Sequence, residues 1–212
     1  VDWNELWLAA RVTILYAFSG AVVCSFLALF VSLLITRYPS RLSIVLERLA
    51  WISHSLPGVI VALALIYFTA RHLHPVYQTS AILIAGYAIL YLPVAIGPQR
   101  AGLSQAQASL EHVAQTLGAG SFGTFLRVTL PLALPGILAG AMLVALNISK
   151  ELTMTLLMRP TGVHTLATRL WSTTDGEVLD FRVAAPYALT LVLLTAAPTW
   201  LLVRMSLEPE RR

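Results

Sequence analysis

The sequence predicts an all-α protein that crosses a membrane several times. Of its 212 residues, 58% are hydrophobic and only 11% are charged, which is more apolar sequence than one soluble core of this size requires. The apolar residues gather in long runs, and a single polar stretch over about residues 103–131 interrupts them. No composition shift divides the chain, so we expect one domain over residues 1–212.

Five apolar runs have about the length that crosses roughly 30 Å of hydrocarbon as a helix. They cover residues 13–36, 56–70, 79–99, 133–157 and 183–205. The second run is short, but residues 42–53 extend it with helical periodicity. The sequence Ser55-Leu56-Pro57-Gly58 between the two parts predicts a kink, because proline removes a backbone donor. Inside a membrane, a kink needs neighbouring groups or a cavity that satisfy the freed backbone atoms.

The polar stretch predicts a hydrophilic helical hairpin between the third and fourth runs. Its first half places apolar residues at helical spacing, which is typical of a short amphipathic helix. These residues are Leu103, Ala106, Leu110, Val113, Ala114 and Leu117. Gly118 and Gly120 can adopt a positive φ that ends this helix, and Ser121 is a suitable N-cap for the second one. Pro131 and Pro135 mark the return to the next apolar run.

Basic residues indicate how the runs are oriented. If the hairpin lies inside, five runs also place the 37–48 loop and the C-terminus inside. Those segments hold eight of the fourteen Lys and Arg residues, namely Arg37, Arg41, Arg48, Arg100, Arg127, Arg204, Arg211 and Arg212. The other side carries Arg11, Arg71, Arg159, Arg169 and Arg182, of which three share a loop with Asp175, Glu177 and Asp180. Because cytoplasmic loops are enriched in basic residues, the bias predicts a cytoplasmic hairpin.

An ionisable pair lies within the fourth run. Lys150 follows Pro135 by fifteen residues, about 22 Å of helix rise, which puts Lys150 and Glu151 in the outer third of the hydrocarbon core. Ionisable groups are costly there and commonly mark a transport path. A continuous helix would align Asn147, Lys150, Glu151, Met154 and Thr155 in one stripe that lines a cavity or meets a partner. Alternatively, Lys150 extends outward and Glu151 bonds to a neighbouring helix.

Enzymatic and metal-binding interpretations lack the required residues. The sequence contains no phosphate-binding Gly-x-x-x-x-Gly-Lys-Ser/Thr loop, no HExxH, no nucleophile elbow and no Gly-x-Gly-x-x-Gly, so any ATP hydrolysis belongs to another chain. A single cysteine, Cys24, excludes an intrachain disulfide and a multi-cysteine metal cluster. His72 and His74 share a predicted outer loop with Tyr77, but no third ligand lies nearby. We therefore expect no catalytic residue, cofactor or metal, and no nucleic-acid partner.

The hairpin resembles the cytoplasmic "EAA" loop of ABC-importer permeases. That loop reads Glu-Ala-Ala, three residues, Gly, nine residues and Ile-x-Leu-Pro. Gly118, Val128 and Leu130-Pro131 keep this spacing, whereas the first triplet falls on His112-Val113-Ala114 and Glu111 lies one position early. In this family the loop docks in a cleft of the ATPase subunit. The alternative is a plain amphipathic linker on the membrane surface.

Two other segments resemble the C-terminal half of ferric-iron permeases. One is Leu56-Pro57-Gly58-Val59-Ile60, and the other runs from Lys150-Glu151-Leu152 to a predicted outer helix ending at Trp171. The resemblance implies a methionine-permease-like transmembrane fold in the bacterial inner membrane. It also implies cytoplasmic ATPase subunits, an extracytoplasmic substrate-binding protein and a second permease half. Since the chain opens on Val-Asp-Trp-Asn without an initiator methionine, we expect the second half of a longer permease.

Two sets of residues follow as candidates for function. The ATPase-coupling set is Leu110, Glu111, His112, Val113, Ala114, Gly118, Val128, Leu130 and Pro131, and the permeation-path or gate set is Asn147, Lys150, Glu151 and Thr155. We expect import of ferric iron by alternating access. Thiamine, sulfate or molybdate, polyamine and phosphonate permeases share this architecture. An independent secondary transporter or channel, with Lys150 and Glu151 as its coupling pair, and a membrane scaffold are the alternatives of other classes.

Overall fold

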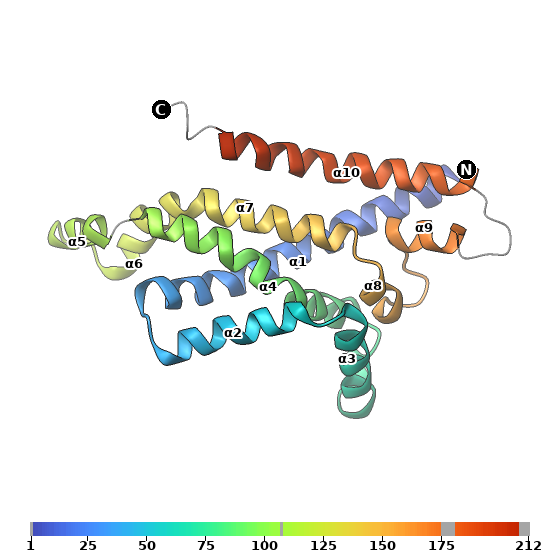
Figure 1. The fold of residues 1–212 in the computed structure, drawn as a ribbon, viewed down its shortest axis with the longest axis horizontal. Coiled ribbons are helices and arrows are strands. Elements are labelled where there is room, and N and C mark those ends of the chain that lie inside the picture. Colours follow the sequence, from blue (N-terminus) through green and yellow to red (C-terminus); the bar gives the residue numbers. More distant parts are fainter. Residues whose placement is uncertain (1, 107, 175–180, 208–212) are drawn as a thin grey trace.

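A computed structural model of the protein describes residues 2–106, 108–174 and 181–207, and every regular element in these ranges is helical (Figure 1). The longest elements are α1 (Trp3–Arg37), α4 (Ser80–Gln105), α7 (Leu130–Ser149) and α10 (Phe181–Leu207). Two helices of intermediate length, α2 (Arg41–Ser55) and α3 (Gly58–His72), join α1 to α4. The short elements are η1 (His74–Val76), α5 (Ala108–Thr116), α6 (Ser121–Thr124), the π-helical turn η2 (Phe125–Thr129), α8 (Thr153–Met158) and α9 (Leu166–Thr174).

The structure confirms several membrane-spanning helices. Four helical stretches in the described ranges are long and apolar enough to cross a membrane, and the α2–α3 pair is a fifth if it counts as one span. The two helices of that pair meet at an angle of 103°, so the predicted kink is a near right-angle bend. It lies at Leu56-Pro57, where the Leu56 amide donates to the Ser53 carbonyl and α3 begins after the proline.

The fourth span differs from its predicted extent at both ends. It begins at Ser121, because α6, η2 and α7 follow one another without a loop, and it ends at Ser149 instead of residue 157. The predicted single stripe from Asn147 to Thr155 is therefore wrong. The Glu151 carboxylate accepts hydrogen bonds from the backbone amides of Met154 and Thr155, and this local alternative to the helical ladder starts a new helix, α8.

Small side chains let the central helices approach closely. Helix α1 packs along α4 and α7 (Figure 1), and its buried residues over the middle of the helix are Gly20, Ala21, Cys24, Ser25, Ala28 and Ser32. They recur at spacings of three and four, so they form one stripe of the helix. The spacing matters because helices in lipid associate mainly through close van der Waals packing.

Helices α4 and α7 cross at glycines. A Cβ atom on Gly102 would lie 2.9 Å from the Ala133 carbonyl oxygen, and one on Gly140 would lie 3.0 Å from the Ala95 carbonyl oxygen. At Gly136 an added Cβ would meet the Pro98 carbonyl and approach the Cα of Gly102 to 2.8 Å. The two backbones therefore touch, and no larger residue fits at these positions.

The elements sort to two ends of the bundle. Figure 1 shows α5 and α6 at one end and α8, α9 and the start of α1 at the opposite end. The end of α1, the start of α2 and the C-terminal end of α10 lie toward the α5–α6 end. This arrangement places the predicted cytoplasmic segments together, as far as they fall within the described residues; Arg211 and Arg212 lie outside them. Which membrane face this end occupies stays a prediction.

Crowding at Gly136 generates a stability prediction. In Gly136→Ala the new methyl group meets backbone atoms of α4, which cannot move aside as a side chain can, so the helices must separate. We expect the free energy of unfolding to fall by about 1–3 kcal/mol, measured as a lower thermal midpoint of the purified protein in detergent. Gly97→Ala is the matched control, since nothing lies within 4 Å of a Cβ there. Equal effects of the two variants would contradict the close crossing.

Candidate functional site

The predicted hairpin is present and turns at Gly118. This residue has a φ of +90°, as its predicted role requires, whereas Gly120 has a φ of −67°. The Ala119 amide donates to the Ala114 carbonyl and the Gly118 amide to the Gln115 carbonyl, which is the pairing of a Schellman motif. Ser121 is the first residue of α6 and not its N-cap, because Gly120 takes that position without a side-chain hydrogen bond.

Apolar side chains of the hairpin face outward. Leu117 is 83% exposed and Phe122 is 75% exposed, and Leu110 and Val113 on α5 are exposed as well. We call these four residues the hairpin face. Large apolar side chains gathered on a surface commonly mark a binding site for another protein. The remaining members of the predicted coupling set vary in exposure: His112 and Pro131 are exposed, while Ala114, Val128 and Leu130 are half-buried.

Glu111 turns toward the bundle. Its Oε1 atom accepts a hydrogen bond from Arg37 Nη2 at 2.6 Å and from Thr129 Oγ1 at 2.8 Å. The same Arg37 nitrogen donates to the carbonyls of Leu103, at 3.5 Å, and Ala106. The Arg37 and Glu111 side chains are 17% and 20% exposed. We call Arg37, Glu111 and Thr129 the inner clamp, because they join the ends of α1 and α4 to α5 and η2.

A polar cavity of about 240 Å³ lies beside the inner clamp. It is lined by Leu33, Arg37, Tyr38, Glu111, Gln115, Ser121, Thr124, Phe125 and Thr129. Within the described part of the chain, the buried Arg37 Nε and Thr124 Oγ1 atoms find no hydrogen-bond partner. A cavity of this size and polarity has room for ordered water that would satisfy them.

At the opposite end, the break between α7 and α8 gathers two of the predicted path residues. Both Glu151 carboxylate oxygens accept hydrogen bonds: Oε1 from the Met154 amide, and Oε2 from the Thr155 amide and hydroxyl, each at 3.0 Å. The buried Tyr87 hydroxyl lies 2.6 Å from Thr155 Oγ1. A Cβ atom on Gly58 would lie 3.4 Å from Glu151 Oε1, so the carboxylate faces the bend between α2 and α3.

The other two path residues do not join this group. Asn147 donates to the Leu143 carbonyl of its own helix at 2.8 Å, and Lys150 is exposed at the end of α7. Sequence reasoning missed Tyr87, which comes from another helix and fits an ordinary apolar span. It also treated Arg37 only as a topology signal, although a basic residue ending a long apolar helix is suited to bind nearby carbonyl groups.

The outer histidine pair gains no partner for metal binding. His72 stacks on Phe68, and its Nδ1 lies 3.3 Å from the Phe68 carbonyl oxygen, while His74 belongs to η1. In residues 2–106, 108–174 and 181–207, no three His, Cys, Asp or Glu side chains are grouped so that they could hold a metal ion.

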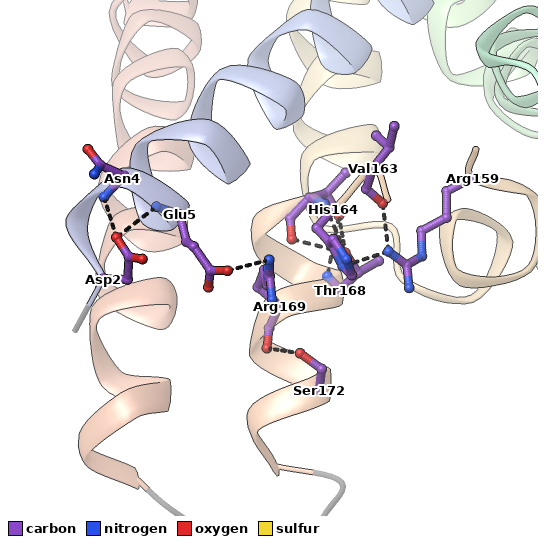
Figure 2. A network of polar contacts seen from close by, with 10 residues as sticks. Asp2, Asn4, Glu5, Arg159, Val163, His164, Thr168, Arg169 and Ser172 are labelled. Atoms are coloured by element: carbon purple, nitrogen blue, oxygen red, sulfur yellow. Dashed lines mark hydrogen bonds and ion pairs between the residues drawn. The ribbon is translucent and has the colours of Figure 1, made fainter. Parts of the chain in front are cut away.

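A polar network fastens α9 to the start of α1 (Figure 2). Arg169 Nη2 pairs with Glu5 Oε1 at 3.0 Å, and Arg159 Nη1 donates to the Val163 carbonyl and to His164 Nδ1, each at 2.6 Å. Since a guanidinium only donates, Nδ1 must be the unprotonated nitrogen of His164. Burial lowers the pKa of His164 below its usual 6.5, and the nearby Arg159 and Arg169 charges lower it further.

The helices and the hairpin define a class: a polytopic helical membrane protein that carries a helical hairpin with exposed apolar side chains at one end. Residues 25–205 match the family described as binding-protein-dependent transport system inner membrane component, and the chain belongs to this family. It is thus an inner-membrane permease of the ABC-importer type that crosses the membrane several times. The family is one of transport components and not an enzyme class.

Relatives of the chain transport different substrates. It is 37% identical to the Fe(3+)-transport system permease protein FbpB 2 of Haemophilus influenzae over 98% of this chain and 40% of that protein, so it spans about two fifths of that relative's length. It is 26% identical to the putative 2-aminoethylphosphonate transport system permease protein PhnV of Salmonella typhimurium, over 95% of this chain and 74% of the relative. The molybdenum transport system permease protein ModB of Mycobacterium tuberculosis is 29% identical, over 68% of this chain and 61% of the relative.

Solved transporter structures share the fold. The inward-facing MetNI methionine ABC transporter aligns with a TM-score of 0.72 and 19% identity, over 97% of each chain. An amino acid ABC transporter aligns with a TM-score of 0.69 and 15% identity, over 100% of this chain and 96% of that one. The predicted methionine-permease-like fold is therefore confirmed.

The outer network generates a pH prediction. With its pKa lowered on folding, His164 binds its proton more weakly in the folded than in the unfolded state. Neutral His164 therefore stabilises the fold fully above pH 6.5, the ordinary pKa of histidine, and this stabilisation is lost as the pH falls through the lowered pKa of the folded state. The thermal midpoint should fall between about pH 7.5 and about pH 5 in the wild type, and less in His164→Asn. If the thermal midpoints of the two proteins depended on pH in the same way, protonation of His164 would not affect the stability of the fold.

Proposed function

We propose that this chain is the permease half of an ABC importer that moves ferric iron inward by alternating access. A cytoplasmic ATPase pair drives it, an extracytoplasmic binding protein delivers the ion, and a second permease half, fused or separate, completes the pathway. Residues 1–212 act as one transmembrane domain with its coupling loop at about 103–131. The observation that carries the proposal is the hairpin face, which exposes four apolar side chains on a rigidly capped turn at the end of the bundle.

The hairpin face suits docking of α5 into a groove of a soluble protein. An amphipathic helix binds such a groove through apolar residues at spacings of three and four, and Leu110, Val113 and Leu117 have this spacing. They lie outside the long apolar stretches that could cross a membrane. A surface-lying linker would instead bury these side chains among lipids, and for that purpose the helix needs no fixed attachment to the bundle.

Alternating access requires that groups of helices move as rigid bodies. The glycine and alanine contacts among α1, α4 and α7 leave no space for these helices to slide independently. A pull on the hairpin therefore reaches the membrane as a rigid-body movement. The chain lacks a phosphate-binding loop, so the energy of ATP must enter mechanically through the hairpin.

Ferric iron is favoured by the extent of similarity. The iron permease relative is 37% identical over nearly the whole chain, whereas the phosphonate and molybdenum relatives are 26% and 29% identical. Charge agrees with this choice. We place the gate at Glu151 and Thr155, with Asn147 and Lys150 nearby along the chain. The Glu151 carboxylate lies just beyond the end of the fourth span and against the bend between α2 and α3, where its negative charge would attract a cation.

Adding a charge to the hairpin face tests the docking. We expect Leu110→Asp and Val113→Asp to remove the ATPase from the detergent-solubilised complex, because each places a carboxylate in a desolvated interface. The measurement is the amount of ATPase that co-purifies with the tagged permease. Ser172→Asp is the matched control, since it adds the same charge to an exposed position of α9 at the opposite end. Unchanged co-purification of both hairpin variants would rule out the docking surface.

Uptake by proteoliposomes tests the substrate. Vesicles holding the full permease and its ATPase, with the cognate binding protein outside, should accumulate ferric iron when ATP is inside and should not accumulate molybdate or 2-aminoethylphosphonate. Glu151→Gln should reduce uptake about tenfold or more while the ATPase stays bound, because the cation loses its attracting charge. Uptake of an oxyanion in place of iron would refute the substrate, and full uptake by Glu151→Gln would refute the gate.

A further inference from the structure

We infer that Arg37 is a positioning residue for energy coupling: through the inner clamp it fixes α5 to the bundle, so that hairpin and helices move together. This inference rests on the proposed function, because it assigns how a force on the hairpin is passed on. It differs from the docking proposal, which concerns the outward face of the same helix. Arg37 itself points inward and belongs to α1, far from the hairpin in sequence.

One guanidinium serves three separate elements. Arg37 is the last residue of α1, and it donates to the Leu103 and Ala106 carbonyls at the end of α4 and to Glu111 of α5. The last carbonyls of a helix have no partner within the helix and carry partial negative charge, so a cation there is favourable. Glu111 then neutralises the guanidinium and binds the Thr129 hydroxyl of η2.

Apolar packing does not hold α5 in place. Its large apolar residues, Leu110 and Val113, are exposed, and a cavity of about 240 Å³ lies between this helix and the ends of α1 and η2. A short helix with so few buried contacts would otherwise detach from the bundle easily. The charged hydrogen bonds of the inner clamp therefore attach α5 to the ends of α1 and α4.

The clamp also accounts for the position of Glu111. Its Oε1 atom already accepts from both Arg37 and Thr129, and the side chain is only 20% exposed. Glu111 is thus turned away from the hairpin face. Docking and attachment are divided between the two sides of α5: apolar side chains meet the ATPase, and the carboxylate holds the helix at a fixed angle.

The test separates binding from coupling in the reconstituted transporter. Arg37→Gln and Glu111→Gln each remove one charge of the pair while keeping a polar side chain, and Glu111→Gln also keeps the size of the side chain. We expect each variant to retain the ATPase on co-purification and to hydrolyse ATP, but to transport roughly five- to tenfold less substrate per ATP hydrolysed. Arg37→Lys should be intermediate, because its ammonium keeps the positive charge but is more strongly hydrated than a guanidinium and sits on a shorter, more flexible stem.

Arg100→Gln is the matched control. Arg100 of α4 pairs with Glu47 of α2 at 2.9 Å, with side chains 52% and 26% exposed, so it is an ion pair between helices that does not reach the hairpin. This variant should keep the wild-type ratio of transport to hydrolysis. The double variant Arg37→Gln/Glu111→Gln should be no worse than the worse single variant, because both changes break the same interaction.

The outcomes distinguish this inference from the proposed function. If the wild-type chain binds no ATPase, the proposed function fails. If the wild type couples hydrolysis to transport and Arg37→Gln couples equally well, only the inner clamp is refuted. Independent, additive losses in the double variant would also refute it, since they would mean that Arg37 and Glu111 act separately.

Discussion

Close contact between the backbones of α1, α4 and α7 is the constraint on which the rest of the structure depends. Lipid chains are as apolar as leucine side chains, so burial of apolar surface alone does not bring membrane helices together. Van der Waals contact does, and it requires that the helices approach each other closely. Gly102 and Gly136 provide such a distance between α4 and α7. The small buried stripe of α1 provides another, and the Gln99 side chain bridges α4 to the Ser25 carbonyl of α1 at 3.1 Å. These contacts make a closely packed three-helix unit to which the other elements attach.

Helix α1 connects the two functional ends of that unit. Near its start Glu5 pairs with Arg169 of α9, and at its end Arg37 pairs with Glu111 of α5. The two anchoring residues are separated by 32 positions, about 48 Å along a helix. Because a continuous helix transmits displacement along its axis, a movement at one end of α1 need not pass through a chain of side-chain contacts to reach the opposite end. The two ion pairs attach α5 and α9 to α1, and α1 spans the distance between them.

Periodicity and turn chemistry predicted the features that depend on neighbouring residues. The apolar runs, the Leu-Pro-Gly bend and the positive φ of Gly118 all follow from short-range preferences. The end of α7 was not predicted, because a carboxylate hydrogen-bonding to amides three and four residues ahead leaves the apolar pattern unchanged. The inner clamp and the Tyr87–Thr155 contact join residues 74 and 68 positions apart, and hydrophobic spacing carries no signal for such pairs.

The interruptions of the helices leave backbone groups that need partners outside the helical ladder. The first amides of a helix have no partner within the helix, and at the start of α8 a side chain supplies one. Glu151 accepts hydrogen bonds from the Met154 and Thr155 amides in the first turn of α8, and His54, at the end of α2, lies 2.7 Å from the Leu90 carbonyl of α4. Both breaks face the same region, since Glu151 lies against Gly58 at the start of α3. A hydrogen bond from a side chain can exchange its partner, whereas the backbone contacts at the glycine crossing of α4 and α7 have no such freedom. Two interruptions of the bundle, at Leu56-Pro57 and at Lys150-Glu151, therefore meet at one place in the fold.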